Sequence, residues 1–135
     1  MRTNCSGFTL IELMVVVIII AALAGMVLPY VIPAKEEAMA KIAEADVANI
    51  STALKFFRLH NNRYPSTEEG LKILLKPSSS PTWKGAYLEK EPRDPWKKPY
   101  KYASPGTHNT AGYDIWSAGP DGQDNTDDDV GNWEK

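Results

Sequence analysis

A dense group of carboxylates near the C-terminus is the part of this sequence best suited to chemistry. Five aspartates fall between positions 121 and 129, with no His or Cys among them. Crowded carboxylates repel one another unless a cation lies between them, and a set of hard oxygen ligands favours Ca²⁺ over zinc. A solvated acidic tail accounts for the same composition equally well. The five residues are Asp121, Asp124, Asp127, Asp128 and Asp129.

The spacing of these carboxylates excludes an EF-hand. Counted from Asp121, an EF-hand loop needs Gly at its sixth position and a bidentate Glu at its twelfth. The chain has Thr126 and Asn132 there. A calcium site in this loop must therefore use another ligand arrangement.

Glu12 is the second chemically distinctive residue, because it begins a long apolar segment. Residues 13–28 are all apolar or Gly, and with Tyr30 tolerated the run reaches Ala34, a total of 22 residues. About 20 residues suffice to span a bilayer as a helix. A carboxylate in lipid costs roughly 2.5–3.5 kcal/mol at the helix centre and less near an end. Glu12 therefore either reaches the headgroup region or pairs with a cation.

The residues before Glu12 offer such a cation. The segment from Gly7 to Glu12, GFTLIE, resembles the type IV prepilin processing site, where a dedicated peptidase cuts after the glycine on the cytoplasmic side. Cleavage between Gly7 and Phe8 creates an α-amino group four residues before Glu12. The resemblance implies that this amine on Phe8 is N-methylated and that Glu12 pairs with the terminus of a neighbouring subunit during assembly.

The apolar segment is expected to remain in the mature protein. Only Arg2 precedes it as a basic residue, and no small-residue cleavage motif follows it, unlike an ordinary secretory signal. Arg2 lies before the segment and Lys35, Glu36 and Glu37 lie after it. This weak charge bias predicts a cytoplasmic N-terminus and an external C-terminal domain.

Composition limits what the rest of the chain can be. The chain has 135 residues and a formal charge of -2, and its acidity is concentrated after Tyr113. The only cysteine is Cys5, which excludes a disulfide framework and a cysteine metal site. His60 and His108 are the only histidines, neither lies in a catalytic motif, and both are expected at the surface. With no Gly-rich phosphate loop, we predict a protein that is not an enzyme.

A long helix is expected to position the N-terminal group. It should run from about Thr9 to about His60, with Gly25, Pro29 and Pro33 interrupting or kinking it. Its second half carries an apolar stripe with helical spacing, which predicts one face against a core. The stripe consists of Met39, Ala43, Val47, Ile50, Leu54 and Phe57.

The remaining elements are short. Ser66 and Glu69 form a capping box before a short helix that ends at Pro77. Residues 100–103 and 113–117 are β-rich and are expected to pair as antiparallel strands. The fold class is therefore α+β, a long helix on a small antiparallel sheet. The four tryptophans should pack the helix stripe against this sheet; they are Trp83, Trp96, Trp116 and Trp133.

Motifs along nearly the whole chain resemble the major pseudopilin of type II secretion systems, the general secretion pathway protein G family. The resemblance implies a subunit that waits in the inner membrane and is trimmed by prepilin peptidase. An assembly platform and its ATPase then add it to a helical homopolymer with minor pseudopilins. This periplasmic filament pushes folded proteins through an outer-membrane secretin, and no nucleic acid is involved. The motifs are residues 8–12, Asn61 to Pro65, Thr67 to Leu71, Asp94-Pro95-Trp96, Pro99-Tyr100, Tyr113-Asp114 and Gly119 to Trp133.

The resemblance also implies domain limits and calcium ligands. Residues 1–7 form the leader, residues 8–34 the membrane and filament-core helix, and residues 35–135 the periplasmic domain. The C-terminal segment is similar to the calcium loop of this family, which raises the calcium interpretation above the solvated tail. Asp124 and Asp127 are then outer charges or have no role. Carried over by position, the ligands are the side chains of Asp121, Asp128 and Asp129 and the carbonyls of Ala118 and Thr126.

Two alternatives and one departure remain. The alternatives are a type IV pilin for adhesion, motility or DNA uptake, which usually has a C-terminal cysteine pair absent here, and a membrane-tethered calcium-binding module that never polymerises. The departure is Lys97-Lys98, which replaces a turn that is commonly Gly-Asn. These lysines extend a basic cluster with Lys84, Lys90, Arg93 and Lys101 that could face the acidic loop of a neighbouring subunit.

Overall fold

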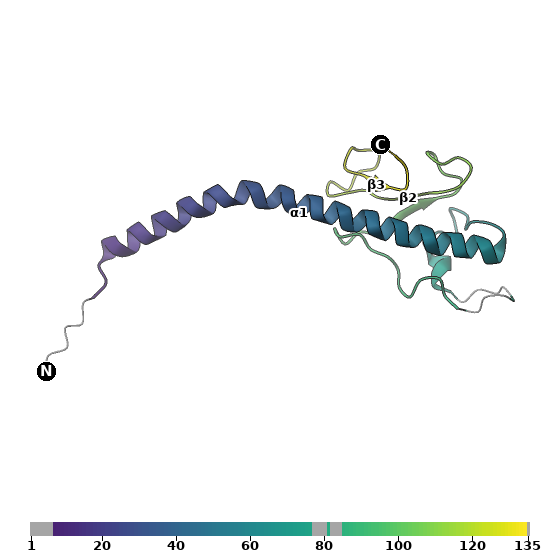
Figure 1. The fold of residues 1–135 in the computed structure, drawn as a ribbon, viewed down its shortest axis with the longest axis horizontal. Helices are drawn as coiled ribbons and strands as arrows, with labels where there is room; N and C mark the ends of the chain where they lie inside the picture. Colours follow the sequence, from purple (N-terminus) through teal and green to yellow (C-terminus); the bar gives the residue numbers. More distant parts are fainter. Residues whose placement is uncertain (1–6, 77–80, 82–84, 135) are drawn as a thin grey trace. The chain divides into compact units, whose positions relative to one another are not determined.

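The computed structural model describes residues 7–76, 81 and 85–134, with only the backbone defined at residues 28–32. Its elements are α1 (Leu10–Asn61), the 3₁₀ helix η1 (Leu71–Leu75), β1 (Lys101–Ala103), β2 (Asp114–Ser117) and β3 (Val130–Gly131), as Figure 1 shows. The chain divides into two compact units, Met1–Glu36 and Glu37–Lys135.

Helix α1 agrees with the predicted helix to within one residue at each end. It continues through Gly25, Pro29 and Pro33, so the predicted interruptions are wrong at the level of secondary structure. A proline inside a helix removes one hydrogen bond and crowds the preceding turn, and a long helix can absorb this loss by bending without ending.

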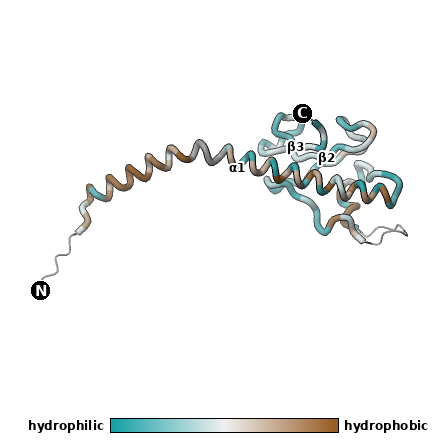
Figure 2. Tube along the Cα trace, in the orientation of Figure 1, coloured by the Kyte–Doolittle hydropathy of each residue, from teal (hydrophilic) through white to brown (hydrophobic). Residues whose placement is uncertain are grey.

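The first unit contains the only segment, among the residues described, that is long and apolar enough to cross a membrane. This segment is Leu10–Val27, and none of it is buried within the chain. Figure 2 shows mostly hydrophobic colouring along it, with a hydrophilic band near its start. A helix that is apolar on all sides needs an apolar environment on all sides, which a bilayer or a bundle of similar helices provides.

The second unit has a core built on one face of α1. The predicted stripe is confirmed from Ala43 onward, because Ala43, Val47, Ile50, Leu54 and Phe57 are all buried, whereas Met39 at its start is only half-buried. Most of the stripe packs in one cluster with side chains from η1 and from the sheet region. The members contributed by those two regions are Leu71, Leu74, Tyr100, Tyr113 and Ile115.

Tyrosines, and not tryptophans, join α1 to the sheet. The prediction for the tryptophans is wrong for Trp96, Trp116 and Trp133, which are only half-buried and lie outside the core cluster, while Trp83 lies outside the described residues. Side chains alternate along a strand, so Ile115 faces the core and Trp116 the opposite side. Buried tyrosine hydroxyls find partners, as where the Tyr102 hydroxyl donates to the Pro65 carbonyl at 2.8 Å. Burial raises the pKa of Tyr102 to about 12, which keeps this donor protonated.

The sheet is antiparallel with the order β1-β2-β3. Its first two strands confirm the predicted pair, and Lys101 lies opposite Trp116 in their register. Strand β3 was not predicted, because its two residues are too few to show an alternating pattern.

The capping box between Ser66 and Glu69 is present. The Ser66 N–H donates to Glu69 Oε2 at 2.8 Å, and the Glu69 N–H donates to Ser66 Oγ at 3.2 Å. Gly70, with φ 56, then ends the turn, so the chain continues as a 3₁₀ helix. A two-pronged bond from Arg63, followed by the Ser66 N–H bond, lowers the pKa of Glu69 to about 2.

A tight turn at Asp94 explains the unusual position of Lys97. The Lys97 N–H donates to the Asp94 carbonyl at 2.9 Å, and the Asp94 N–H donates to the Lys98 carbonyl at 2.8 Å. Lys97 follows the turn with φ 68, in the left-handed region. Hairpin turns of this kind favour Gly at that position. The lysine therefore sits where its backbone conformation is costly.

We predict that Lys97→Gly stabilises the protein by about 0.5–1 kcal/mol, because Gly removes the left-handed penalty. Urea unfolding of the full-length chain in detergent micelles, followed by tryptophan fluorescence, measures this change. Lys97→Ala is the matched control, since it removes the same side chain but keeps the penalty. An equal gain in both variants contradicts the backbone explanation.

Candidate functional site

Two groups of predicted site residues are described by the structure, one at the start of α1 and one between β2 and β3. The first is held by local contacts. The Thr9 N–H and the Thr9 hydroxyl both donate to Glu12 Oε2 at 2.9 Å, and the Glu12 N–H donates to Thr9 Oγ1 at 3.3 Å. Thr9 and Glu12 thus form a capping box. Sequence analysis missed it, although the Thr-x-x-Glu spacing was visible.

The second group lies on the loop from Ala118 to Asp129, which leaves β2 and returns as β3. Both carbonyls predicted as ligands accept hydrogen bonds inside the loop: the Gly122 N–H donates to Ala118 at 3.0 Å and the Asp129 N–H to Thr126 at 3.3 Å. A carbonyl oxygen has two lone pairs, so each retains the capacity for one more partner.

Asp128 is turned toward neutral donors within the loop. The Thr126 hydroxyl donates to its Oδ1 at 2.5 Å, and the Asp121 N–H donates to its Oδ2 at 3.2 Å. These bonds, led by that of Thr126, lower the pKa of Asp128. Gly119, with φ 57, lies so close to Asp128 that no Cβ fits there. The carboxylate of Asp121 accepts from the Gln123 N–H at 2.8 Å.

Asp129 is the buried carboxylate of the loop, with 3% of its surface exposed. Its Oδ2 accepts from the Asn125 N–H at 2.7 Å. Its Oδ1 is buried and has no hydrogen-bond partner among the described residues. Asp129 also lines a cavity of about 50 Å³. A buried carboxylate oxygen without a partner is costly, and a cation bound at this oxygen would relieve that cost.

Asp124 has a role that sequence analysis did not predict. Lys101 Nζ lies 2.7 and 2.6 Å from its two oxygens, and the Trp116 indole N–H donates to Oδ1 at 2.9 Å. These contacts, with that of Lys101 the largest, lower the pKa of Asp124. Lys101 thus binds the acidic loop of its own chain, and the hypothesis that the basic cluster faces the loop of a neighbouring subunit stays a prediction. Lys84 lies outside the described residues.

The oxygen-only donor set and the unpaired Asp129 oxygen fit a hard cation such as Ca²⁺. The side chains are not gathered around one point, however. Among the described residues, no group of three or more His, Cys, Asp or Glu side chains is close enough to hold a metal ion. Cation binding at Asp121, Asp128 and Asp129 therefore requires the first two carboxylates to turn from their present partners.

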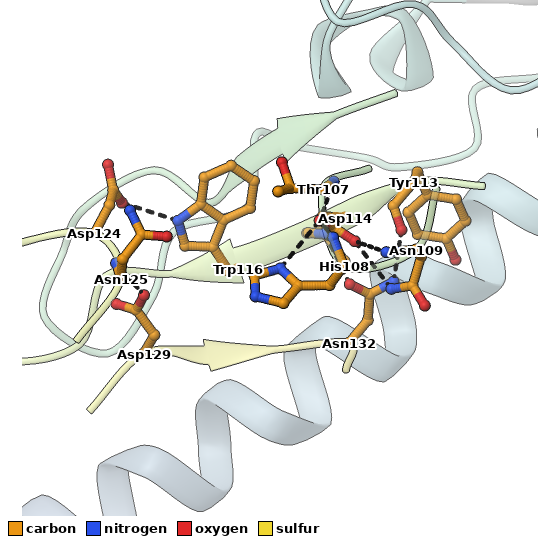
Figure 3. Close-up of polar contacts among 11 residues, drawn as sticks. Thr107, His108, Asn109, Tyr113, Asp114, Trp116, Asp124, Asn125, Asp129 and Asn132 are labelled. Atoms are coloured by element: carbon orange, nitrogen blue, oxygen red, sulfur yellow. Dashed lines mark hydrogen bonds and ion pairs between the residues drawn. The ribbon is translucent and has the colours of Figure 1, made fainter. Parts of the chain in front are cut away.

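A buried carboxylate that sequence analysis missed closes the connection between β1 and β2. Asp114 accepts hydrogen bonds from the backbone N–H groups of Thr107, His108 and Asn109 at 2.7, 2.7 and 2.9 Å, as Figure 3 shows. The Asn109 amide adds a bond at 2.9 Å, and His108 Nδ1 lies 3.2 Å away. Its sequence signals were an acid beside the apolar Tyr113 and Ile115 and the Tyr113-Asp114 motif, to which no role was assigned.

Neither histidine is a free surface residue. The ring of His108 stacks on that of Trp133, with centroids 3.9 Å apart and planes at 5°. His60 is half-buried, and its Nδ1 lies 3.2 Å from the Tyr87 hydroxyl. The prediction of two surface histidines is therefore confirmed for His108, which is exposed, and wrong for His60.

The N-terminal group defines a class of protein. Residues 2–28 match the prokaryotic N-terminal methylation motif, which places the chain among proteins that carry this signal. Residues 30–133 match the family described as Type II secretion system (T2SS), protein G. The chain belongs to this family.

Individual relatives agree with this assignment and confirm the resemblance predicted from the sequence. The chain is 43% identical to the type II secretion system core protein G of Pseudomonas aeruginosa, with 98% of each chain covered. It is 44% identical to that of Aeromonas hydrophila, covering 95% of this chain and 92% of the other.

The predicted α+β fold is confirmed by a solved structure. The crystal structure of the major pseudopilin from the type 2 secretion system of enterohaemorrhagic Escherichia coli matches with a TM-score of 0.64 and 36% identity. The match covers 75% of this chain and 87% of that chain.

We predict that Asp114→Asn lowers the free energy of unfolding by about 2 kcal/mol at pH 7, because an amide donor then faces N–H donors. Burial raises the pKa of Asp114, but the hydrogen bonds outweigh it and the pKa lies below its ordinary value. A lowered pKa means that this stability is present above pH 3.8 and is lost as the pH falls through the folded-state pKa.

Urea unfolding between pH 2 and 7 measures this effect, with exposed Glu68→Gln as the control. The difference between wild type and Asp114→Asn should shrink in acid. A difference that is independent of pH rules out the charge of Asp114 as its cause.

Proposed function

We propose that this chain is the repeating subunit of a type II secretion pseudopilus, which polymerises from the inner membrane and drives folded proteins through the outer-membrane secretin. The observation that carries this proposal is the match to the protein G family over residues 30–133, joined to the methylation motif over residues 2–28. Leu10–Val27 is the membrane anchor before assembly. Because this segment has no buried face of its own, helices of neighbouring subunits replace lipid around it in the filament.

The proposed maturation follows from the N-terminal residues. Prepilin peptidase cuts between Gly7 and Phe8 on the cytoplasmic side and methylates the new amine of Phe8. Residues 35–135 lie in the periplasm. The assembly platform and its ATPase then add the subunit to a homopolymer that also contains minor pseudopilins. Residues 7–9 precede the helix and are not part of it, which supports access to this site.

Glu12 has two proposed roles in this process. Its contacts with Thr9 cap the first turn of α1 within one subunit. Its charge also offsets the amine of Phe8 on the neighbouring subunit, since a carboxylate surrounded by apolar helices needs a counterion. A glutamine can fill the capping role but not the charge role.

We predict that Glu12→Ala and Glu12→Gln are both cleaved at Gly7-Phe8 and both fail to form filaments. N-terminal sequencing of membrane-extracted protein checks cleavage, and electron microscopy of sheared filaments checks assembly. Thr9→Ala is the control, because it removes the cap and keeps the charge. Normal filaments from Glu12→Gln would falsify the pairing role and leave only the cap.

We also propose that the acidic loop binds Ca²⁺ through Asp121, Asp128, Asp129 and the carbonyls of Ala118 and Thr126. The unpaired Asp129 Oδ1 supports this proposal, as does the all-oxygen donor set. When bound, the cation would supply positive charge to three carboxylates and join the two ends of the loop. Without the cation, hydrogen bonds from the Asp121 and Asn125 N–H groups to Asp128 and Asp129 already hold the two parts of the loop together.

We predict that EDTA lowers the melting temperature of the full-length chain in detergent micelles. A ligand at 100 times its Kd contributes about 2.7 kcal/mol, which corresponds to a shift of roughly 10 °C or more in a domain of this size. Asp129→Asn should abolish the shift. Asp127→Asn, a matched change in the same loop, should keep it. If EDTA leaves the melting temperature of the wild-type protein unchanged, the calcium proposal is wrong and the loop is a solvated acidic segment.

A further inference from the structure

The acidic loop is held in two different ways along its length. In its first half, residues 121–125, Lys101 binds Asp124 and the ammonium group of Lys98 lies against Gly122. In its second half, the donors to Asp128 and Asp129 among the described residues are neutral. They are the Thr126 hydroxyl and the backbone N–H groups of Asp121 and Asn125. Among these contacts, Asp128 and Asp129 therefore have no cationic partner.

Two neighbouring strands direct their side chains at Asp124. Lys101 on β1 lies directly opposite Trp116 on β2, so their side chains leave the same face of the sheet. The ammonium group of Lys101 contacts both oxygens of Asp124, and the indole N–H of Trp116 donates to one of them. Figure 3 shows the contact between Trp116 and Asp124. One loop carboxylate is thus bound from two strands at once.

Lys98 adds a second ammonium group to this half. Its Nζ lies against Gly122, where φ is 73 and a Cβ would collide with it. The backbone of Lys98 is fixed, because its N–H donates to Asp94 Oδ1 at 2.7 Å. Asp94 is buried and accepts the Ser117 hydroxyl at 2.5 Å.

The backbone connects this anchored half to the proposed cation ligands. Asn125 follows Asp124 directly, has φ 65, and donates its N–H to Asp129 Oδ2 at 2.7 Å. A fixed Asp124 therefore fixes the donor that orients the buried carboxylate of Asp129. The path from Lys101 to Asp129 passes through two hydrogen-bonded contacts and one peptide bond.

We propose that Lys101 is a built-in counterion that holds residues 121–125 on the sheet before any cation binds, and thereby positions Asp129. Lys101 is a positioning residue and does not touch the cation. The first part of this inference is independent of calcium, and the second part rests on the proposed calcium site. The effect of Lys101 on stability and on calcium affinity should be small, because exposed ion pairs are weak individually. The side chains of Lys101 and Asp124 are 42% and 39% exposed.

The test compares Lys101→Met with the rescue variant Lys101→Arg, both in the full-length chain in detergent micelles. The control is Lys72→Met, which makes the same change of charge at an exposed and remote position on η1. In EDTA, hydrogen exchange of the Trp116 indole N–H, assigned with Trp116→Phe, should be faster in Lys101→Met and unchanged in the other two. With calcium, titration should show an apparent Kd about two- to five-fold higher in Lys101→Met alone.

A double variant separates an ion pair from a general loss of structure. Lys101→Met/Asp124→Asn removes the unpaired carboxylate, so its loop should resist proteolysis in EDTA better than that of Lys101→Met. If the increase in proteolysis rate in the double variant equals the sum of the increases in Lys101→Met and in Asp124→Asn alone, the counterion role is wrong. Indole exchange in Lys101→Met equal to that in Lys72→Met overturns it as well.

The two arms also distinguish this inference from the calcium proposal. If wild-type protein shows no calcium binding but Lys101→Met accelerates indole exchange, the anchoring role stands and the positioning of a cation ligand is overturned. If calcium binds equally to all variants, the cation site stands and Lys101 has no part in it.

Discussion

The folded domain depends on the burial of one face of α1. The three strands of its sheet are short, and η1 spans five residues, so neither element has an extensive apolar face of its own. The stripe from Ala43 to Phe57 supplies what these elements lack, and Leu54, Leu74 and Ile115 meet there without exposed surface. Burial of about 0.8 kcal/mol per methylene makes this contact the main source of stability. The other elements are positioned by where they meet this stripe.

Hydrogen-bonded carboxylates fix the segments that apolar burial does not reach. Asp94 fixes the turn before β1, Asp114 closes the connection from β1 to β2, and Asp124 joins the following loop to the sheet. Each accepts several donors from a segment that has little core of its own. A small domain without disulfides often lacks enough core to order its loops. Here, charge-assisted hydrogen bonds order them, at the cost of stability in acid.

Most of the architecture could be predicted from the sequence, because it follows from periodicity and local signals. The apolar stripe predicted α1, the Ser66–Glu69 spacing predicted a capped turn, and two β-rich runs predicted β1 and β2. The contacts of Lys101 and Asp124 could not be predicted, since they depend on which strand residues lie opposite one another, and those of Asp114 depend on the fold of the loop at residues 107–109. A single sequence does not contain that register. The misplaced Trp116 has a related cause, because one step along β2 separates the core side of Ile115 from the outer side of Trp116.

The capping box at Thr9 and Glu12 also sets a boundary along the chain. A peptidase binds its substrate as extended backbone, whose N–H and C=O groups remain free to pair with the enzyme. Within α1 these groups are already hydrogen-bonded to one another, and the capping box stabilises this pairing from the first turn of the helix. Gly7 and Phe8 lie just outside it. In the proposed maturation, the same two side chains that begin the helix would therefore mark where trimming stops, and the anchor would be protected by its own first turn.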